Sequence, residues 1–189
     1  NKIITGTCGD NVNFSYNEDT GEMFIYGSGN MKDLKYSNKS PWNDYQDDIK
    51  SVVINDSVTS IGDYAFKNCK KITSVSIPAS VTSIGISAFY YNSMLSSITI
   101  PESVTSIGYE AFQYSGLTSI FIPNSVNSIG ITVFKGCSKL EAINVSVENQ
   151  AYMSKDGVLF KHDKTELIAC PAVKKGRYSI PYGVKIIAN

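Results

Sequence analysis

The sequence has little of what catalytic and nucleic-acid-binding sites are built from. It contains a single histidine, and its 17 basic residues are balanced by 17 acidic ones. Zero formal charge without a dense Lys and Arg run argues against nucleic acid as a partner, because binding to phosphate backbones rests on clustered positive charge. The histidine, His162, lies beside Asp163 in the polar segment "KHDKT". Adjacent residues in a turn rarely converge, so we interpret it as a solvated turn residue rather than part of a dyad.

Catalytic motifs are missing as well. The chain has no P-loop, no G-x-S-x-G and no dinucleotide fingerprint. "DTG" at 19–21 matches one half of an aspartic-protease site, but a hairpin turn is the better interpretation. The acidic run "DYQDD" at 44–48 is better interpreted as a solvated loop than as a weak cation site. We therefore expect no enzyme, no cofactor and no metal site.

Long hydrophobic runs are also absent. No stretch approaches the ~20 consecutive apolar residues of a membrane-spanning helix, so we expect no direct membrane insertion. The chain begins at Asn1 without a basic-then-apolar leader, and we expect any signal or anchor to lie outside this stretch. Apolar residues nevertheless make up 42% of the chain, which is enough to bury a core.

A short repeat accounts for most of the chain. Ile-Gly pairs begin at residues 61, 84, 107 and 129, so the spacings are 23, 23 and 22. In the same register, Phe recurs at 66, 89, 112 and 134, and Val at 58, 81, 104 and 126. A fixed period of this length predicts a solenoid in which each repeat is one supersecondary unit.

Each repeat can be interpreted physically from its third copy. Ile98 and Ile100 alternate with polar residues, which is typical of a half-buried strand, and Pro101 closes the strand because it cannot donate to a ladder. Val104 and Ile107 then point inward again, three residues apart. We expect successive strands to stack in parallel about 4.8 Å apart.

The repeat closes on the far side of the coil. Gly108 stands where backbone conformation or close packing excludes a side chain, and Ala111 and Phe112 are expected to form a short helical turn. No single repeat can bury its own apolar side, so only the stack makes a continuous core.

The pattern L-x-x-I-x-I-P-x-x-V-x-x-I-G-x-x-A-F-x-x-C resembles the leucine-rich repeat of the BspA-like surface proteins. The resemblance covers about residues 49–145, as four full repeats and the start of a fifth. The segment "TGTCGDNVNFSYNEDTGEMFIYGSGNM", followed by "SPWNDY", is similar to the segment that leads into the repeats in that family. The predicted fold is a leucine-rich repeat solenoid, rich in parallel stacked strands, with an N-terminal β-hairpin cap.

Residues 1–48 are predicted to form the capping segment. Apolar residues alternate on both sides of the turn signal "NEDTG", which predicts a β-hairpin. Trp42 is expected to cover the open end of the first coil, because a terminal repeat without a cap exposes core and sheet edge.

Residues 49–189 are predicted to form the repeat array. The register breaks after Val145, and "GVLFKHDKTELIACP" predicts an inserted β-hairpin near 150–171. The register restarts at Ile180 with "IPYGVKII", but the sequence ends at Asn189, before the next Phe of the repeat. We therefore predict that the last repeat is truncated here and that further repeats follow it in the intact protein. Its apolar residues and uncovered edge predict weak self-association through this C-terminal coil.

The four cysteines stand at 8, 69, 137 and 170. An even number is compatible with disulfides. However, Cys69 and Cys137 occupy the same repeat position three coils apart, roughly 14 Å at about 4.8 Å per coil, which is beyond the ~7 Å limit for a bridge. We predict that this pair is not bonded.

Two surfaces are candidate binding sites. On the strand side the outward residues are mostly small, and Phe121 is the exception. On the opposite side, variable positions of adjacent repeats become apolar or aromatic together. These positions are Ile86, Tyr90, Tyr91, Tyr109 and Tyr114. Aromatic residues are enriched at interface hot spots. Two other interpretations stay open: tyrosines that wedge between coils, and a strand side that is only β-compatible filler.

The resemblance implies a non-catalytic cell-surface or secreted protein-binding module, an adhesin or surface antigen that contacts host cells or matrix proteins. Its partner would be an extracellular protein or a host-cell surface ligand. The alternatives are a structural spacer repeat, which only extends another domain, and a glycan-binding module that uses aromatic platforms.

Overall fold

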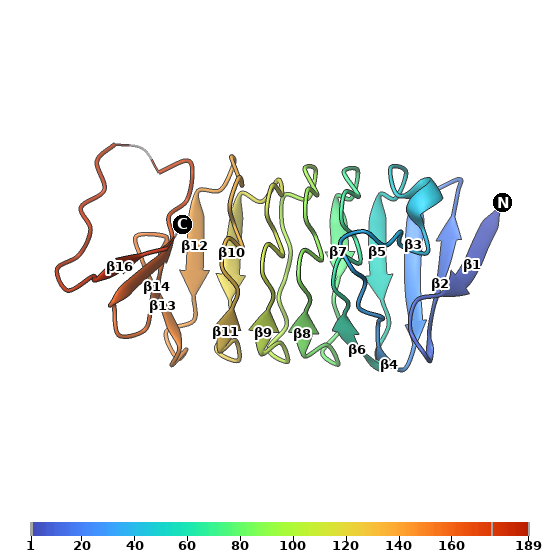
Figure 1. The fold of residues 1–189 in the computed structure, drawn as a ribbon, viewed down its shortest axis with the longest axis horizontal. Helices are drawn as coiled ribbons and strands as arrows, with labels where there is room; N and C mark the ends of the chain where they lie inside the picture. The colour runs from blue at the N-terminus through green and yellow to red at the C-terminus, as the bar shows by residue number, and fades with distance from the viewer. Residues whose placement is uncertain (1, 175, 189) are drawn as a thin grey trace.

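The computed structural model describes residues 2–174 and 176–188. Figure 1 shows similar coils stacked side by side into an elongated solenoid, with an antiparallel hairpin at the N-terminal end and a small sheet at the C-terminal end. The predicted fold class is confirmed. Among the described residues one helical element is present, the short 3-10 helix η1 (Asn43–Tyr45).

One side of the stack, the strand face, carries the longer strands. They form a five-stranded sheet in the order β1-β2-β3-β5-β7 and a separate parallel pair, β10-β12. The bounds are β1 Ile3–Thr7, β2 Val12–Asn17, β3 Glu22–Gly27, β5 Ser51–Ile54, β7 Ser74–Ser76, β10 Ser119–Ile122 and β12 Ala142–Val145.

A second side, the serine face, is a parallel sheet in the order β11-β9-β8-β6-β4. Its bounds are β4 Gly29–Asn30, β6 Val58–Ile61, β8 Ser83–Ile84, β9 Ser106–Ile107 and β11 Ser128–Ile129. The sequence analysis missed this sheet. Two apolar residues three apart, such as Val104 and Ile107, do not show the alternation that signals a strand.

The third side, the turn face, carries the expected turns, but they are single turns rather than helices. Two residues in each coil have positive φ, between 50° and 72°, which ends each turn after a few residues. These residues are Tyr64 and Asn68, Ser87 and Tyr91, Glu110 and Tyr114, and Thr132 and Gly136.

Backbone hydrogen bonds run from coil to coil along the turn face. The amides of Tyr64, Phe66 and Asn68 donate to carbonyls of the next coil at 2.7–2.8 Å. The pattern recurs from the second to the third coil and from the third to the fourth. Three ladders, one on each face, therefore hold the coils together.

A stack of aromatic rings forms the centre of the core beneath the turn face. Trp42 begins the stack, and its ring centroid lies 5.1 Å from that of Phe66. The Phe rings then follow at 5.7, 5.7 and 6.1 Å, from Phe66 through Phe89 and Phe112 to Phe134. All five side chains are buried.

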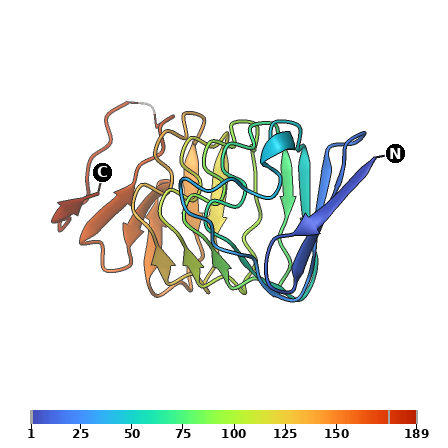
Figure 2. The ribbon, with the colours of Figure 1, turned by 45° about the vertical axis from the view of Figure 1, so that its right-hand side comes forward.

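The N-terminal cap is built as expected, with one strand more. β2 and β3 pair antiparallel, and β3 continues in parallel with β5 of the first coil, so the cap is hydrogen-bonded to the array. The additional strand β1 pairs with β2, and Figure 2 shows it at the N-terminal end of the stack. The boundary between residues 48 and 49 stays a prediction.

Trp42 covers the N-terminal end of the core and also provides a hydrogen bond at the N-terminal end of the turn-face ladder. Its indole Nε1 donates to the carbonyl of Ala65 at 3.0 Å, and the amide of Leu34 donates to the carbonyl of Asp63 at 3.0 Å. In later coils, backbone amides occupy the corresponding positions. The prediction that Trp42 covers the first coil is confirmed.

The C-terminal end is a sheet in the order β13-β14-β15-β16. Its bounds are β13 Tyr152–Lys155, β14 Val158–Lys161, β15 Glu166–Ala169 and β16 Ile186–Ile187. β14 and β15 pair antiparallel within the expected insert, and β13 adds a strand that the sequence analysis missed. Asn1 and Asn189 lie outside the described residues.

Candidate binding surface

Three of the predicted tyrosines meet on the turn face. The ring centroids of Tyr90 and Tyr114 lie 5.7 Å apart, those of Tyr91 and Tyr114 lie 5.5 Å apart, and those of Tyr90 and Tyr91 lie 6.1 Å apart. We call these three residues the tyrosine cluster. Tyr91 is 40% exposed and Tyr114 is 38% exposed. Each ring therefore packs against a neighbouring coil and also presents surface to solvent.

The backbone beneath two of these rings is unusual for tyrosine. Tyr91 has φ 60° and Tyr114 has φ 57°, whereas the equivalent residues of the first and fourth coils are Asn68 and Gly136. Asn and Gly adopt this left-handed region readily, but other L-residues do so at a cost of roughly 1–2 kcal/mol. The tyrosines thus occupy positions that backbone geometry alone would give to other residues. Positive φ also occurs at Ser87 and Glu110 of the same coils, so it belongs to the turn itself, and the two tyrosines add partly exposed rings to it.

The surroundings of the cluster hold the two strained rings in place. A Cβ added at Gly136 would lie 2.2 Å from the Tyr114 ring, so this ring lies directly against the glycine backbone of the next coil. On the other side, the Lys70 ammonium lies 5.3 Å from the Tyr91 ring centroid. The cluster, which belongs to the second and third coils, therefore contacts the turns of the first and fourth coils as well.

The sequence analysis missed a second aromatic group on the same face. The Tyr36 and Tyr64 rings meet edge to face at 6.1 Å, and the Lys67 ammonium lies 3.4 Å from the Tyr36 ring centroid. Tyr64 belongs to a variable repeat position and could have been suspected. Tyr36 precedes the repeats, so no register relates it to the cluster.

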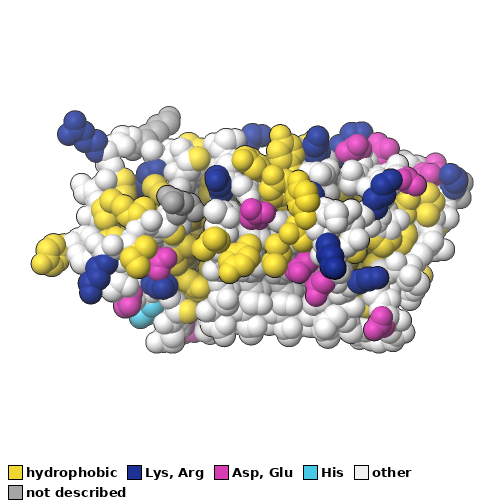
Figure 3. Space-filling model, in the orientation of Figure 1, with side chains coloured by type: hydrophobic (Ala, Val, Ile, Leu, Met, Phe, Trp, Pro, Cys, Tyr) yellow, Lys and Arg dark blue, Asp and Glu magenta, His cyan; other side chains and the backbone are white. Residues whose placement is uncertain are grey.

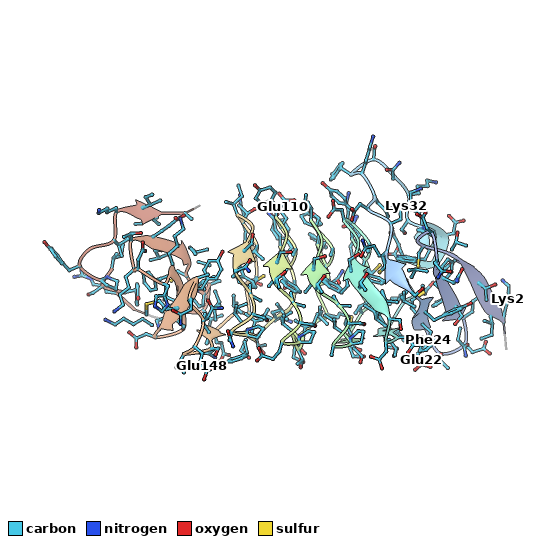
Figure 4. The ribbon with its side chains drawn as sticks, turned by 90° about the horizontal axis from the view of Figure 1, so that it is seen from below. Lys2, Glu22, Phe24, Lys32, Glu110 and Glu148 are labelled. Atoms are coloured by element: carbon cyan, nitrogen blue, oxygen red, sulfur yellow. The ribbon has the colours of Figure 1, made fainter. Side chains whose placement is uncertain are left out.

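Glu110 brings negative charge to this surface. Its Oε2 accepts a hydrogen bond from Ser87 Oγ at 3.0 Å. Desolvation raises the pKa of the Tyr90 hydroxyl, and the charges of Tyr114 and Glu110 add to this effect. Figure 4 shows Glu110 on the opposite side of the molecule from Phe24 of β3, and Figure 3 shows hydrophobic side chains gathered across the middle of the face on the Glu110 side.

Ile86 and Tyr109 lie at a neighbouring position, where the turn face meets the serine face. Tyr109 is 53% exposed and Ile86 is half-buried. Within the described chain, no ring contact joins Tyr109 to the tyrosine cluster. Both residues line a shallow groove of about 450 Å³ that runs along the serine face.

Phe121 lies on a different face from the other candidates. It belongs to β10, is 52% exposed and shares the strand face with Phe24, which is 41% exposed. The structure therefore divides the six predicted residues into the cluster, the groove pair and an isolated phenylalanine. Their role in binding stays a prediction.

The structure also shows the environments of the cysteines and the histidine. All four cysteines are free, and His162 is exposed. Across residues 2–174 and 176–188, no group of three or more His, Cys, Asp or Glu residues could hold a metal ion. In the same part of the chain, no helix has the length and apolar character to cross a membrane.

The repeats match the profile of a known protein family. The family profile described as "BspA type Leucine rich repeat region" matches residues 44–156 in six copies. No curated protein matches the sequence at a significant level.

Several solved structures are similar to the chain. A leucine-rich repeat protein from Eubacterium ventriosum ATCC 27560 is 30% identical with a TM-score of 0.80, over 100% of this chain and 56% of that one. The pneumococcal vaccine antigen PcpA is 20% identical with a TM-score of 0.67, over 99% of this chain and 60% of that one. A leucine-rich repeat protein from Bacteroides ovatus ATCC 8483 is 26% identical with a TM-score of 0.53, over 74% and 40%. The chain thus spans little more than half the length of the first two structures.

Proposed function

Because the chain belongs to the BspA-type leucine-rich repeat family, we propose that it is a non-catalytic binding module, secreted or displayed at a cell surface. Its partner in this proposal is an extracellular protein or a host-cell surface ligand, as for an adhesin or surface antigen. One structural relative is a pneumococcal vaccine antigen, which supports the proposed location.

The observation that carries the proposal is the left-handed backbone at Tyr91 and Tyr114. A tyrosine at such a position costs stability that Asn68 and Gly136 do not, while its ring gains surface that a partner can contact. Tyrosine also has few rotors to immobilise on binding and a hydroxyl that can pair with a partner. The turn face with its tyrosine cluster is therefore the proposed contact surface.

The test uses residues that the chain itself carries at the equivalent positions. Tyr91→Asn and Tyr114→Gly reproduce Asn68 and Gly136, so the backbone geometry is retained. After a screen on host matrix proteins and on a glycan array identifies a ligand, the double variant should bind it more weakly by over about 2 kcal/mol, roughly 30-fold. Its free energy of unfolding should change by about 1 kcal/mol or less.

Phe121→Ser is the matched control, because it removes an exposed aromatic side chain from the strand face. Full binding by the double variant, together with a loss of binding in the control, would transfer the site to the strand face. A protein that binds nothing in either screen supports the spacer alternative, and a glycan that binds through the cluster supports the glycan-binding one.

A further inference from the structure

One position in each coil, after the glycine in the four repeats and after Lys32 in the capping segment, carries a carboxylate in only part of the stack. It is occupied in successive coils by Asp33, Asp63, Ile86, Tyr109 and Ile131, as the coil-to-coil hydrogen bonds align them. Asp33 Oδ1 accepts a hydrogen bond from the Asp63 amide at 3.0 Å. Asp63 Oδ1 accepts one from the Ile86 amide at 2.7 Å. Each aspartate thus satisfies the amide one coil further along.

The next two coils lack this acceptor. Ile86 and Tyr109 replace the aspartates, and their side chains cannot accept a hydrogen bond at this place. Within the described chain, the amides of Tyr109 and Ile131 have no hydrogen-bond acceptor. Tyr109 is 53% exposed and Ile131 is 65% exposed, so both residues face solvent.

These residues follow the glycines of the groove on the serine face. A Cβ added at Gly108 would lie 2.5 Å from the Ile86 nitrogen, and one added at Gly130 would lie 2.3 Å from the Tyr109 nitrogen. The backbone of each glycine therefore packs closely against the preceding coil, where a side chain would not fit. Ser106 and Ser128 line the same groove of about 450 Å³.

We propose that the amides of Tyr109 and Ile131 bind a carboxylate of a ligand, as the amides of Asp63 and Ile86 bind the carboxylates of Asp33 and Asp63. Hydrogen bonds from amides to an ionised acceptor are shorter and stronger than those between neutral groups. The exposed side chains of Tyr109 and Ile131 flank the site with apolar surface. This combination suits an Asp or Glu side chain of a partner polypeptide better than a free, strongly hydrated acid.

This inference goes beyond the proposed function, because it concerns backbone amides in the groove and none of the three residues of the tyrosine cluster. The two can fail separately. Loss of the carboxylate site leaves the cluster intact, and the Tyr91 and Tyr114 variants leave the groove amides unchanged.

The test follows the amide resonances of the full chain by ¹H–¹⁵N NMR. The probe is a blocked Gly-Glu-Gly tripeptide, its Gln analogue is the matched control, and sodium acetate at equal ionic strength is the free-acid arm. The Tyr109 and Ile131 resonances should shift saturably with the Glu peptide, while the Asp63 and Ile86 resonances stay in place because their acceptors are already present. Affinity for the Glu peptide should exceed that for the Gln analogue at least tenfold.

The variant Ile86→Asp places a carboxylate where Asp63 has one in the preceding coil. It should remove the response of the Tyr109 amide while the Ile131 amide still shifts, and the remaining resonances report whether the fold is retained. Stronger binding of the peptide than of acetate supports a side-chain carboxylate, and the reverse order overturns that assignment. Equal shifts with the Glu and Gln peptides, or an unchanged Tyr109 response in Ile86→Asp, would overturn the site itself.

Discussion

A single step along the third coil separates core from surface. Ile100 is 5% exposed, whereas the side chain of Thr99 faces solvent. Ile100→Ala should lower the free energy of unfolding by about 2–5 kcal/mol, because it removes buried methyl groups and leaves a cavity. Thr99→Ala should change it by no more than about 0.5 kcal/mol. The structure assigns no strand here, but the predicted alternation of buried and exposed side chains is present. Urea titrations of both variants check this, and similar midpoints would contradict that alternation.

The thiols differ sharply in burial, which sets their reactivity. Cys8, Cys69 and Cys137 are buried and Cys170 is exposed. Desolvation raises the pKa of Cys8 to about 12 and also raises that of Cys69 and Cys137. A thiol reagent at pH 8 should therefore label Cys170 alone in the folded protein and all four after unfolding. Rapid labelling of two or more thiols in the native state would show that the coils open readily.

The same shifts make stability depend on pH. The buried thiols keep their protons to a higher pH in the folded chain than the unfolded thiols do, whose pKa is about 8.5. Their contribution is therefore fully present below about pH 8.5 and declines as the pH rises toward 12. Replacing the three buried cysteines by Ala should flatten this decline in a series of melts at increasing pH.

Residue environments were predictable where the repeat fixed them. The register places Ile100 inside and Thr99 outside, and it puts Cys69 and Cys137 in different coils. The left-handed positions were not predicted, although Asn68 and Gly136 at the same repeat position were a signal for them, because Tyr91 and Tyr114 carry no such signal themselves. The sequence pattern also could not predict which backbone amides lack an acceptor. In the described chain the amides of Tyr109 and Ile131 are recognised as such only when the coils are superimposed in the structure.

At the scale of elements, Trp42 combines two capping roles. Its ring begins the aromatic stack and its indole donates to the Ala65 carbonyl at 3.0 Å. Trp42→Phe keeps a ring but removes the donor from a buried acceptor, so it should cost about 1–3 kcal/mol. Trp42→Ala removes both and should cost about 3–5 kcal/mol. Chemical denaturation checks the order, and a Phe variant as stable as the wild type would show that the hydrogen bond adds nothing.

Elements were predicted well where they follow familiar periodicities. The hairpin of β2 and β3 and that of β14 and β15 each combine apolar runs with a polar turn. The serine face has only two-residue strands in its middle coils, too short for alternation to appear. β1 was missed for a related reason: its five residues, "IITGT", begin with two adjacent isoleucines instead of alternating.

For the whole molecule, the C-terminal sheet is the place where self-association is expected. β16 is an edge strand, and its Ile186 and Ile187 are 55% and 58% exposed. With zero net charge there is little repulsion between copies, so we propose weak association through this edge. Ile186→Lys should lower the weight-average mass at high concentration in light scattering. A wild type that stays monomeric throughout would contradict the proposal.

The coil-to-coil direction of the hydrogen bonds also has a mechanical consequence. A pull on the two ends along the stack loads the coils in series, so they should peel away one at a time instead of resisting together. Each coil of 23 residues would release about 70 Å of chain, at roughly 3.4 Å per residue less the spacing of one coil. Single-molecule force spectroscopy should record a regular series of small steps of this length. Under such a load the stack would lengthen coil by coil, and released coils could stack again on their neighbours when the load is removed.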